Sequence, residues 1–151
     1  MKRLSPISSD KALDILNKVE FFDNLTLAEK EILTGFHSHF FFCVKNEAII
    51  TQGALDRSFY ILLTGKVKVH LERSGKTLAL LSPGSIFGEV AFLTDCPRTT
   101  SVNALINSIV FEIDKPTLEH LDVNIREKLK DNIIKVLVER LDHMNSVVAG
   151  K

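Results

Sequence analysis

The sequence predicts a mainly β protein, an antiparallel β-roll or jelly-roll barrel (a double-stranded β-helix) with helices at both ends. Short β-type runs separated by turn residues fill residues 36–113 of the 151-residue chain. Helical periodicity both precedes and follows that stretch. We therefore expect one domain with three parts: a helical lead-in at 1–35, the β-roll at 36–113, and a hinge with helices that serve as a lid or a dimer contact at 114–151.

Composition excludes several classes of protein. Lys plus Arg and Asp plus Glu both number 19, so no basic field attracts nucleic acid or an anionic membrane. No apolar run approaches the roughly 18 residues of a membrane span, and the N-terminus lacks the apolar core of a signal peptide. The two cysteines, Cys43 and Cys96, give no disulfide framework. These observations predict a cytoplasmic protein with no direct nucleic-acid contact.

The lead-in carries the signals of two short helices. The first has apolar residues on helical spacing from Ala12 to Val19, and its N-cap candidates are Ser8, Ser9 and Asp10. The second opens with Thr26 and Glu29, three residues apart as in a capping box, and is expected to end at Gly35. Both helices are expected to seal one edge of the core.

Seven β-type runs are expected between the helices: 40–44, 48–50, 59–63, 67–71, 78–80, 101–104 and 109–113. Ser74–Gly75 suits a tight hairpin. Asn46 suits a left-handed turn position. The alternation of Lys66, Lys68 and His70 places one face of a strand in solvent.

Helical periodicity returns after the last run. Asp114 is an N-cap candidate with Pro116 just inside the turn, and Leu118 and Leu121 are expected to face inward. A longer helix is expected over 124–147, with an apolar line of Ile125, Leu129, Ile133, Val136, Leu137, Leu141, Met144 and Val148. This stripe can pack on the roll alone or also on a second copy, so a homodimer through the C-terminal helix stays open.

The segment 85–102, SIFGEVAFLTDCPRTTSV, carries the chemistry. Gly88 allows a close backbone approach, and the helix that should follow it offers free N–H groups to an anion. Arg98 adds a planar cationic fork suited to phosphate. Glu89 can accept a hydrogen bond from a sugar hydroxyl, so the pair suggests a ribose with a nearby phosphate. The alternative is that Glu89 and Arg98 form a surface ion pair.

This segment resembles the phosphate-binding cassette of cyclic nucleotide-binding domains, in which FGE, an apolar turn and a Pro-Arg pair recur. Those domains occur in protein kinase A regulatory subunits, cyclic-nucleotide-gated channels and catabolite-activator-type regulators. The resemblance covers roughly residues 13–140 and includes VEFFDNLTLAEKEIL and EAIITQGALDRSFYILLTGKVKV. Two departures are 44–47, where the family often has Pro-Gly-Glu, and Val90, where it usually has Leu or Ile. The resemblance implies a stand-alone, non-catalytic sensor that binds cyclic AMP or cyclic GMP and needs no further cofactor.

The resemblance also implies individual roles. Glu89 would accept the ribose 2′-hydroxyl and Arg98 would pair with the cyclic phosphate. The other implied site residues are Phe87 and Val90 on the core side, with Gly88, Ala91, Pro97, Thr99 and Thr100. A hydroxyl residue directly after the arginine is found in members that respond to cyclic GMP, so Thr99 leaves both nucleotides open. Thr99 could equally bond only its own turn.

In the family that the sequence resembles, the last helix usually supplies the lid over the nucleotide base. The candidates in this chain are Val136, Leu137 and Arg140. The family's hinge would lie at about 113–116, and the ligand would draw helices 115–148 toward the roll to regulate a partner that the sequence does not identify.

The residues give weaker support to other function classes. His37, His39, His70, His120 and His143 are scattered and form no catalytic grouping, which argues against an enzyme. His37 and His39 with Cys43 make an incomplete metal-ligand set. Cys96 is a candidate redox-sensitive thiol without an obvious resolving partner. The remaining alternative is a nucleotide-independent dimerisation or interaction module on a degenerate version of the same fold.

Overall fold

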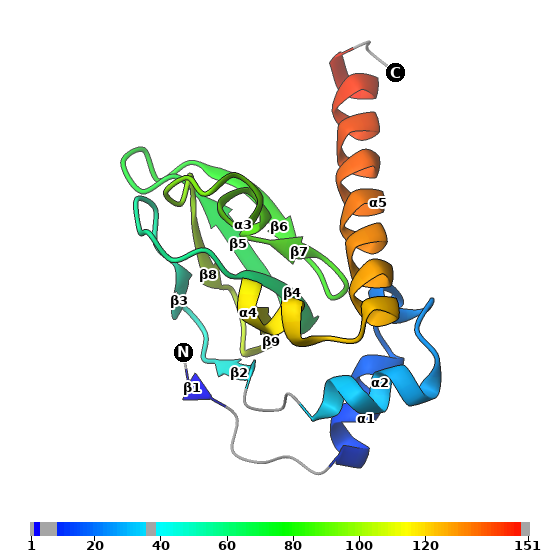
Figure 1. Ribbon diagram of the computed structural model, residues 1–151. Helices are drawn as coiled ribbons and strands as arrows, with labels where there is room; N and C mark the ends of the chain where they lie inside the picture. The colour runs from blue at the N-terminus through cyan, green and yellow to red at the C-terminus, as the bar shows by residue number, and fades with distance from the viewer. Residues whose placement is uncertain (1, 4–8, 36–38, 149–151) are drawn as a thin grey trace.

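Two antiparallel β-sheets form the centre of the molecule (Figure 1). The structure, a computed structural model, describes residues 2–3, 9–35 and 39–148. The five-stranded sheet has the order β1 (Lys2–Arg3), β2 (Phe40–Cys43), β9 (Ser108–Ile113), β4 (Phe59–Thr64) and β7 (Ile86–Phe87). The four-stranded sheet has the order β3 (Ala48–Ile50), β8 (Ser101–Ala104), β5 (Val67–His70) and β6 (Thr77–Leu81). This confirms the predicted antiparallel β-roll with flanking helices.

All seven predicted runs form strands, and two further strands were not predicted. β1 and β7 contain two residues each, which is too short for an alternating pattern to be recognised. β7 pairs with the central strand β4 through Tyr60 opposite Phe87 and Ile61 opposite Ile86. This pairing fixes the start of the 85–102 segment against the sheet.

The predicted turn at Asn46 is confirmed, and the predicted hairpin at Ser74–Gly75 forms with a longer loop, since six residues separate β5 and β6. Asn46 has a φ of 72°, in the left-handed region where asparagine is tolerated. The chain reverses at Ser74–Gly75, and β5 and β6 pair as a hairpin. The predicted solvent face of β5 is wrong at His70, which is only 9% exposed. The pairing register shifts between Val69 and His70, and this irregularity breaks the strict alternation on which the prediction relied.

The buried side chains form two cores that share β4. Phe59, Ile61 and Leu63 belong to the core that the five-stranded sheet forms with the helices. Tyr60 and Leu62, on the opposite face of β4, belong to the core between the two sheets. Because both faces of this strand are covered, it is a continuous apolar run.

The N-terminal helices are α1 (Ser9–Asn17), the 3₁₀ turn η1 (Glu20–Phe22) and α2 (Leu27–Thr34). The capping box is confirmed: the Thr26 hydroxyl accepts from the Glu29 N–H at 3.1 Å, and Glu29 Oε1 accepts from the Thr26 N–H at 2.8 Å. Gly35 ends α2 as predicted, with a right-handed φ of −66°. The N-cap candidate Ser8 and the metal candidate His37 lie outside the described residues.

The C-terminal helices are α4 (Lys115–His120) and α5 (Val123–Val148). Asp114 caps α4 as predicted, since its Oδ1 accepts from the Thr117 N–H at 2.8 Å. The first half of α5 is anchored by buried apolar residues, namely Ile125, Leu129 and Ile133. The second half extends away from the helices at its base (Figure 1), and its apolar residues Leu141, Met144 and Val148 are exposed. The predicted stripe therefore packs on the core as far as Val136 and Leu137, which are partly buried, and is exposed from Leu141 onward.

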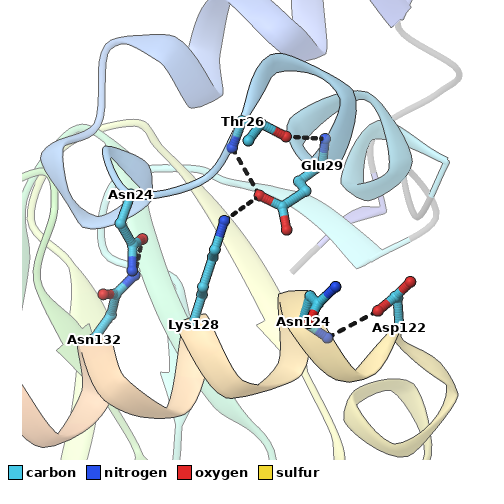
Figure 2. A network of polar contacts seen from close by, with 7 residues as sticks. All are labelled: Asn24, Thr26, Glu29, Asp122, Asn124, Lys128 and Asn132. Carbon is cyan, nitrogen blue, oxygen red and sulfur yellow. Dashed lines mark hydrogen bonds and ion pairs between the residues drawn. The ribbon is translucent and has the colours of Figure 1, made fainter.

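A polar network ties the base of α5 to the N-terminal helices (Figure 2). Lys128 Nζ lies 2.6 Å from Oε1 of Glu29, the same oxygen that caps α2. Asn132 Nδ2 donates to the Phe21 carbonyl at 2.7 Å and to Asn24 Oδ1 at 2.8 Å. The base of α5 and the lead-in are therefore joined by side chains as well as by the apolar core.

Acidification is expected to weaken this network. The contact with Lys128, and then the N–H of Thr26, hold the pKa of Glu29 below its ordinary value of 4.5. A carboxyl group whose pKa is lowered by folding adds stability above its unfolded-state pKa and loses that contribution as the pH falls through its folded-state pKa. The difference in Tm between the wild type and Glu29→Gln should therefore be full at neutral pH and shrink progressively below pH 4.5.

Glutamine can still complete the capping box, so this substitution isolates the charge. The matched control is Glu127→Gln, because Glu127 faces Lys130 at 3.9 Å on the exposed side of α5. Its Tm difference should be small at every pH. A Glu29→Gln difference that does not change with pH would contradict the prediction.

Candidate ligand-binding site

The candidate site begins where β7 meets the short helix α3 (Glu89–Thr94). Phe87, the last residue of β7, is buried and stacks on Tyr60 with ring centroids 5.3 Å apart. The Tyr60 hydroxyl donates to Glu112 Oε2 at 2.8 Å. Burial, followed by the negative charge of Glu112, raises the pKa of Tyr60 far above its usual range, so the hydroxyl stays a donor. The entry to α3 is thus held from the core side.

Gly88 makes the turn into α3 and needs to be a glycine for two reasons. Its φ is 80°, in the left-handed region. A Cβ at this position would lie 2.8 Å from Arg98 Nη1 and 2.9 Å from Ile50 Cδ1. Its carbonyl accepts a hydrogen bond from that same Nη1 at 2.9 Å. The turn and the arginine are therefore built against each other.

Substitution of this glycine should destabilise the protein and displace Arg98. Gly88→Ala is expected to lower the free energy of unfolding by about 1–3 kcal/mol through backbone strain, with a further loss from the clash. Chemical denaturation measures the change. Gly75→Ala is the matched control, because its φ is 67° and a Cβ there would contact nothing within 4 Å. Equal losses in the two variants would show that the close approach to Arg98 has no energetic weight.

A cavity of about 280 Å³ lies beside this turn. Eight of the nine predicted site residues line it: Phe87, Gly88, Glu89, Val90, Ala91, Arg98, Thr99 and Thr100. Pro97 is not among the lining residues. The prediction also missed six further lining residues: Ile50, Val69, Ala79 and Leu81 on strands outside the 85–102 segment, and Ile86 and Val102 within it. The four outside the segment had no signal beyond lying in or next to a predicted strand, and tertiary pairing decides which strands face the cavity.

Arg98 is 3% exposed and is the buried cation of the cavity, which Arg140 also lines. Its Nη2 lies 2.8 Å from Oδ2 of Asp56, an exposed carboxylate in the loop between β3 and β4. Its Nε is buried and has no hydrogen-bond partner among the described residues. Sequence reasoning missed Asp56, because nothing local indicates that this loop reaches Arg98. The guanidinium is thus held through Nη1 and Nη2, while its Nε has no partner among the described residues.

Glu89 is also buried, at 8% exposed, and pairs with the last helix. Arg140 Nη1 lies 2.6 Å from Glu89 Oε1, and Arg140 Nη2 donates to the Ile86 carbonyl. Glu89 and Arg98 therefore each pair with a different residue, so the alternative that they form an ion pair with each other is wrong.

Two of the predicted roles change. Val90 is 45% exposed and does not support α3 from the core side, because the core face of this six-residue helix is formed by Ala91 and Phe92. Of the three lid candidates, only Arg140 lines the cavity. Val136 and Leu137 pack against the core between the sheet and the helices.

The arrangement suits a small ligand with an anion, a hydroxyl and a flat apolar part. The anion would meet Arg98, the hydroxyl would meet Glu89, and the apolar part would lie against the aliphatic walls. Within the described ranges, no group of three or more His, Cys, Asp or Glu is placed to hold a metal ion. Across the same ranges, no helix is both long and apolar enough to span a bilayer.

Comparison with known proteins agrees with this geometry. The family model of the cyclic nucleotide-binding domain matches residues 41–122, which is more than half of the chain and includes the whole cassette. The chain belongs to the cyclic nucleotide-binding domain family. The domain of this family is a regulatory binding fold. This chain has the two sheets, the flanking helices and the C-terminal helix of its structural neighbours.

Individual relatives show how far the similarity reaches. The domain is 34% identical over 87 residues to a cAMP-dependent protein kinase regulatory subunit of Candida albicans, and 29% identical over 138 residues to a cGMP-dependent protein kinase of Toxoplasma gondii. These matches cover 58% and 89% of the chain but only 19% and 13% of those relatives.

Solved structures extend the same likeness to the fold. A cyclic nucleotide-binding domain from Methylobacillus flagellatus superposes with a TM-score of 0.74 at 21% identity, over 95% of this chain and 84% of that one. The catabolite activator protein of Thermus thermophilus superposes with a TM-score of 0.69 at 25% identity, over 85% of this chain and 61% of that one.

Proposed function

We propose that this domain binds a cyclic nucleotide, cyclic AMP or cyclic GMP, in the cavity beside α3 and passes the binding event to its C-terminal helices to regulate a partner. The observation that carries the proposal is the buried guanidinium of Arg98, which lines the cavity together with Glu89 and whose Nε has no hydrogen-bond partner in the described part of the chain. A buried polar donor without a partner is costly, so a ligand anion there would be stabilised.

Two lining residues of the cavity match two groups of a cyclic ribose phosphate. Arg98 would neutralise the ring phosphate, and the carboxylate of Glu89 would accept the 2′-hydroxyl through the oxygen that Arg140 leaves free. The apolar walls formed by Val69, Ala79 and Leu81 suit a purine. No separate cofactor is needed and no catalytic step is proposed.

The contact between Glu89 and Arg140 supports coupling to the last helix. Arg140 lies on the second half of α5, beyond the anchored base, and its guanidinium holds the carboxylate that the ribose would use. A ligand that changes the geometry or partners of Glu89 therefore acts on α5 directly. We expect ligand to change amide hydrogen exchange across 115–148. An unchanged exchange pattern with bound nucleotide would contradict the coupling and leave the binding proposal intact.

The relatives do not indicate whether the nucleotide carries adenine or guanine, because their names divide between cAMP-dependent and cGMP-dependent kinases. Thr99 is exposed at the mouth of the cavity and stays the position to test. Thr99→Ala should weaken cyclic GMP more than cyclic AMP if its hydroxyl contacts the guanine. Equal effects on both nucleotides would assign Thr99 to its own turn.

Calorimetry and thermal shift with both nucleotides test the binding proposal, with 5′-AMP as the non-cyclic control. We expect a dissociation constant near the micromolar range, equivalent to about 8 kcal/mol of binding free energy. Absence of heat and of any shift in Tm with either cyclic nucleotide at millimolar concentration would overturn the proposal.

A second function, self-association, is supported by the exposed apolar residues on the second half of α5. Ile134, Val138 and Leu141 are between 52% and 58% exposed and follow the spacing of four and three residues that is typical of helix pairs. We expect sedimentation to show a homodimer that Leu141→Glu dissociates. A wild-type monomer at high concentration would contradict it.

The regulated partner and the cytoplasmic location stay predictions. The cytoplasmic location rests on two free cysteines, Cys43 and Cys96.

A further inference from the structure

Asp95, which the binding site does not use, lies where three distant segments of the chain meet. It follows α3 with a φ of 57°, and its N–H donates to the Ala91 carbonyl at 3.1 Å, closing the helix. Its Oδ1 lies 3.0 Å from Lys115 Nζ and 3.2 Å from Arg57 Nη1. One carboxylate oxygen therefore joins the end of the cassette helix to the β3–β4 loop and to the first residue of α4.

The loop on one side of Asp95 is the loop that holds the phosphate-binding arginine. Arg57 directly follows Asp56, which pairs with the guanidinium of Arg98. The same loop is also bonded to the arginine's backbone, since the Gly53 N–H donates to the Arg98 carbonyl at 2.8 Å and the Arg98 N–H donates to the Ala54 carbonyl at 2.9 Å. The loop is therefore attached to Arg98 through both the side chain and the backbone of the arginine.

The segment on the other side of Asp95 is the junction with the C-terminal helices. Lys115 opens α4, next to the cap residue Asp114. Its ammonium also lies 5.9 Å from the ring centroid of Phe92, which packs edge-on against Phe59 at 4.8 Å. The first turn of α4 is thus attached to α3 and the residue that ends it through two contacts of Lys115, the ion pair with Asp95 and the cation–π contact with Phe92.

Electrostatics make Asp95 the necessary member of this group. Lys115 holds the pKa of Asp95 below its ordinary value, with a smaller contribution from Arg57, so the carboxylate is charged at neutral pH. Without that charge, two cations from different segments would be left close together and would repel each other. The three side chains are each about half exposed, at 47–52%, so the group adds little to global stability and its strength depends on salt.

We propose that Asp95 is a positioning residue that couples the Arg98–Asp56 pair to the start of α4. The proposal rests on the proposed function for its biological meaning, because a phosphate that binds Arg98 would alter its pairing with Asp56. The loop would then move Arg57 against Asp95, and Asp95 would pass the displacement to Lys115 and the first turn of α4.

A double-mutant cycle in the ligand-free protein tests this coupling without any nucleotide. Asp56→Asn breaks the pair with Arg98, and we expect it to raise amide exchange across 115–120 by about two- to fivefold. In the Asp95→Asn background the same change should have no further effect, and about 0.5 M salt should remove the effect in the wild-type background. Asparagine tolerates the left-handed backbone at this position, so Asp95→Asn is expected to fold.

The matched control is the same cycle with Glu127→Gln in place of Asp95→Asn. Glu127→Gln removes an exposed carboxylate from another ion pair, so Asp56→Asn should still raise amide exchange across 115–120 in that background. Additive effects of Asp56→Asn and Asp95→Asn on 115–120 would overturn the inference. With cyclic nucleotide present, the exchange change at 115–120 should be lost in Asp95→Asn while the dissociation constant changes little. If no nucleotide binds to the wild type, the proposed function fails, and the ligand-free cycle still decides the role of Asp95.

Discussion

Arg98→Ala is expected to weaken cyclic nucleotide binding by at least about 100-fold, the largest effect on affinity that we predict. The physical reason is the loss of the buried cation of the cavity. A hydrogen bond to a charged group contributes about 1.5–3 kcal/mol, and the guanidinium can offer the ring phosphate more than one. Part of this gain is offset, because the phosphate has to compete with Asp56 for Nη2. Calorimetry at matched ionic strength measures the loss.

Two controls separate lost binding from lost folding. Arg98→Lys retains a charge without the planar fork and should recover only part of the affinity. Arg73→Ala removes an exposed arginine from the β5–β6 hairpin and should bind as the wild type does. Unfolding of Arg98→Ala would show as a lost thermal transition. A folded Arg98→Ala protein with wild-type affinity would contradict the assignment of Arg98 to the phosphate.

Leu129→Ala is expected to have the largest effect on stability, a loss of about 2–5 kcal/mol in the free energy of unfolding. Leu129 is 0% exposed and belongs to the core that joins the five-stranded sheet to the helices. Truncation leaves a cavity between the base of α5 and the lead-in, which the Lys128–Glu29 contact alone cannot close. Chemical denaturation followed by circular dichroism measures the loss.

The same substitution twelve residues later on the same helix is the control. Leu141 is 58% exposed, so Leu141→Ala should change stability by no more than about 0.5 kcal/mol in the monomer. Measurement at low protein concentration keeps self-association from contributing. Similar losses in the two variants would mean that α5 is anchored along its whole length.

Local sequence signals predicted the elements well because those signals are themselves local physics. The capping box at Thr26 and Glu29 and the cap at Asp114 form because each needs only residues three positions apart. The strands that failed, β1 and β7, contain two residues each and leave no pattern to recognise. Val90 failed for a related reason, since six helical residues do not reveal which side faces the core.

The sequence by itself determined most of the elements, the left-handed turn at Asn46 and the presence of an acid and a base nine residues apart in one segment. Only the tertiary structure decided what those two groups touch: Asp56 approaches Arg98 from 42 residues away, and Arg140 approaches Glu89 from 51 residues away. The reason is that chain geometry restricts near neighbours strongly, whereas partners so far apart meet only when sheet pairing and core packing bring them together.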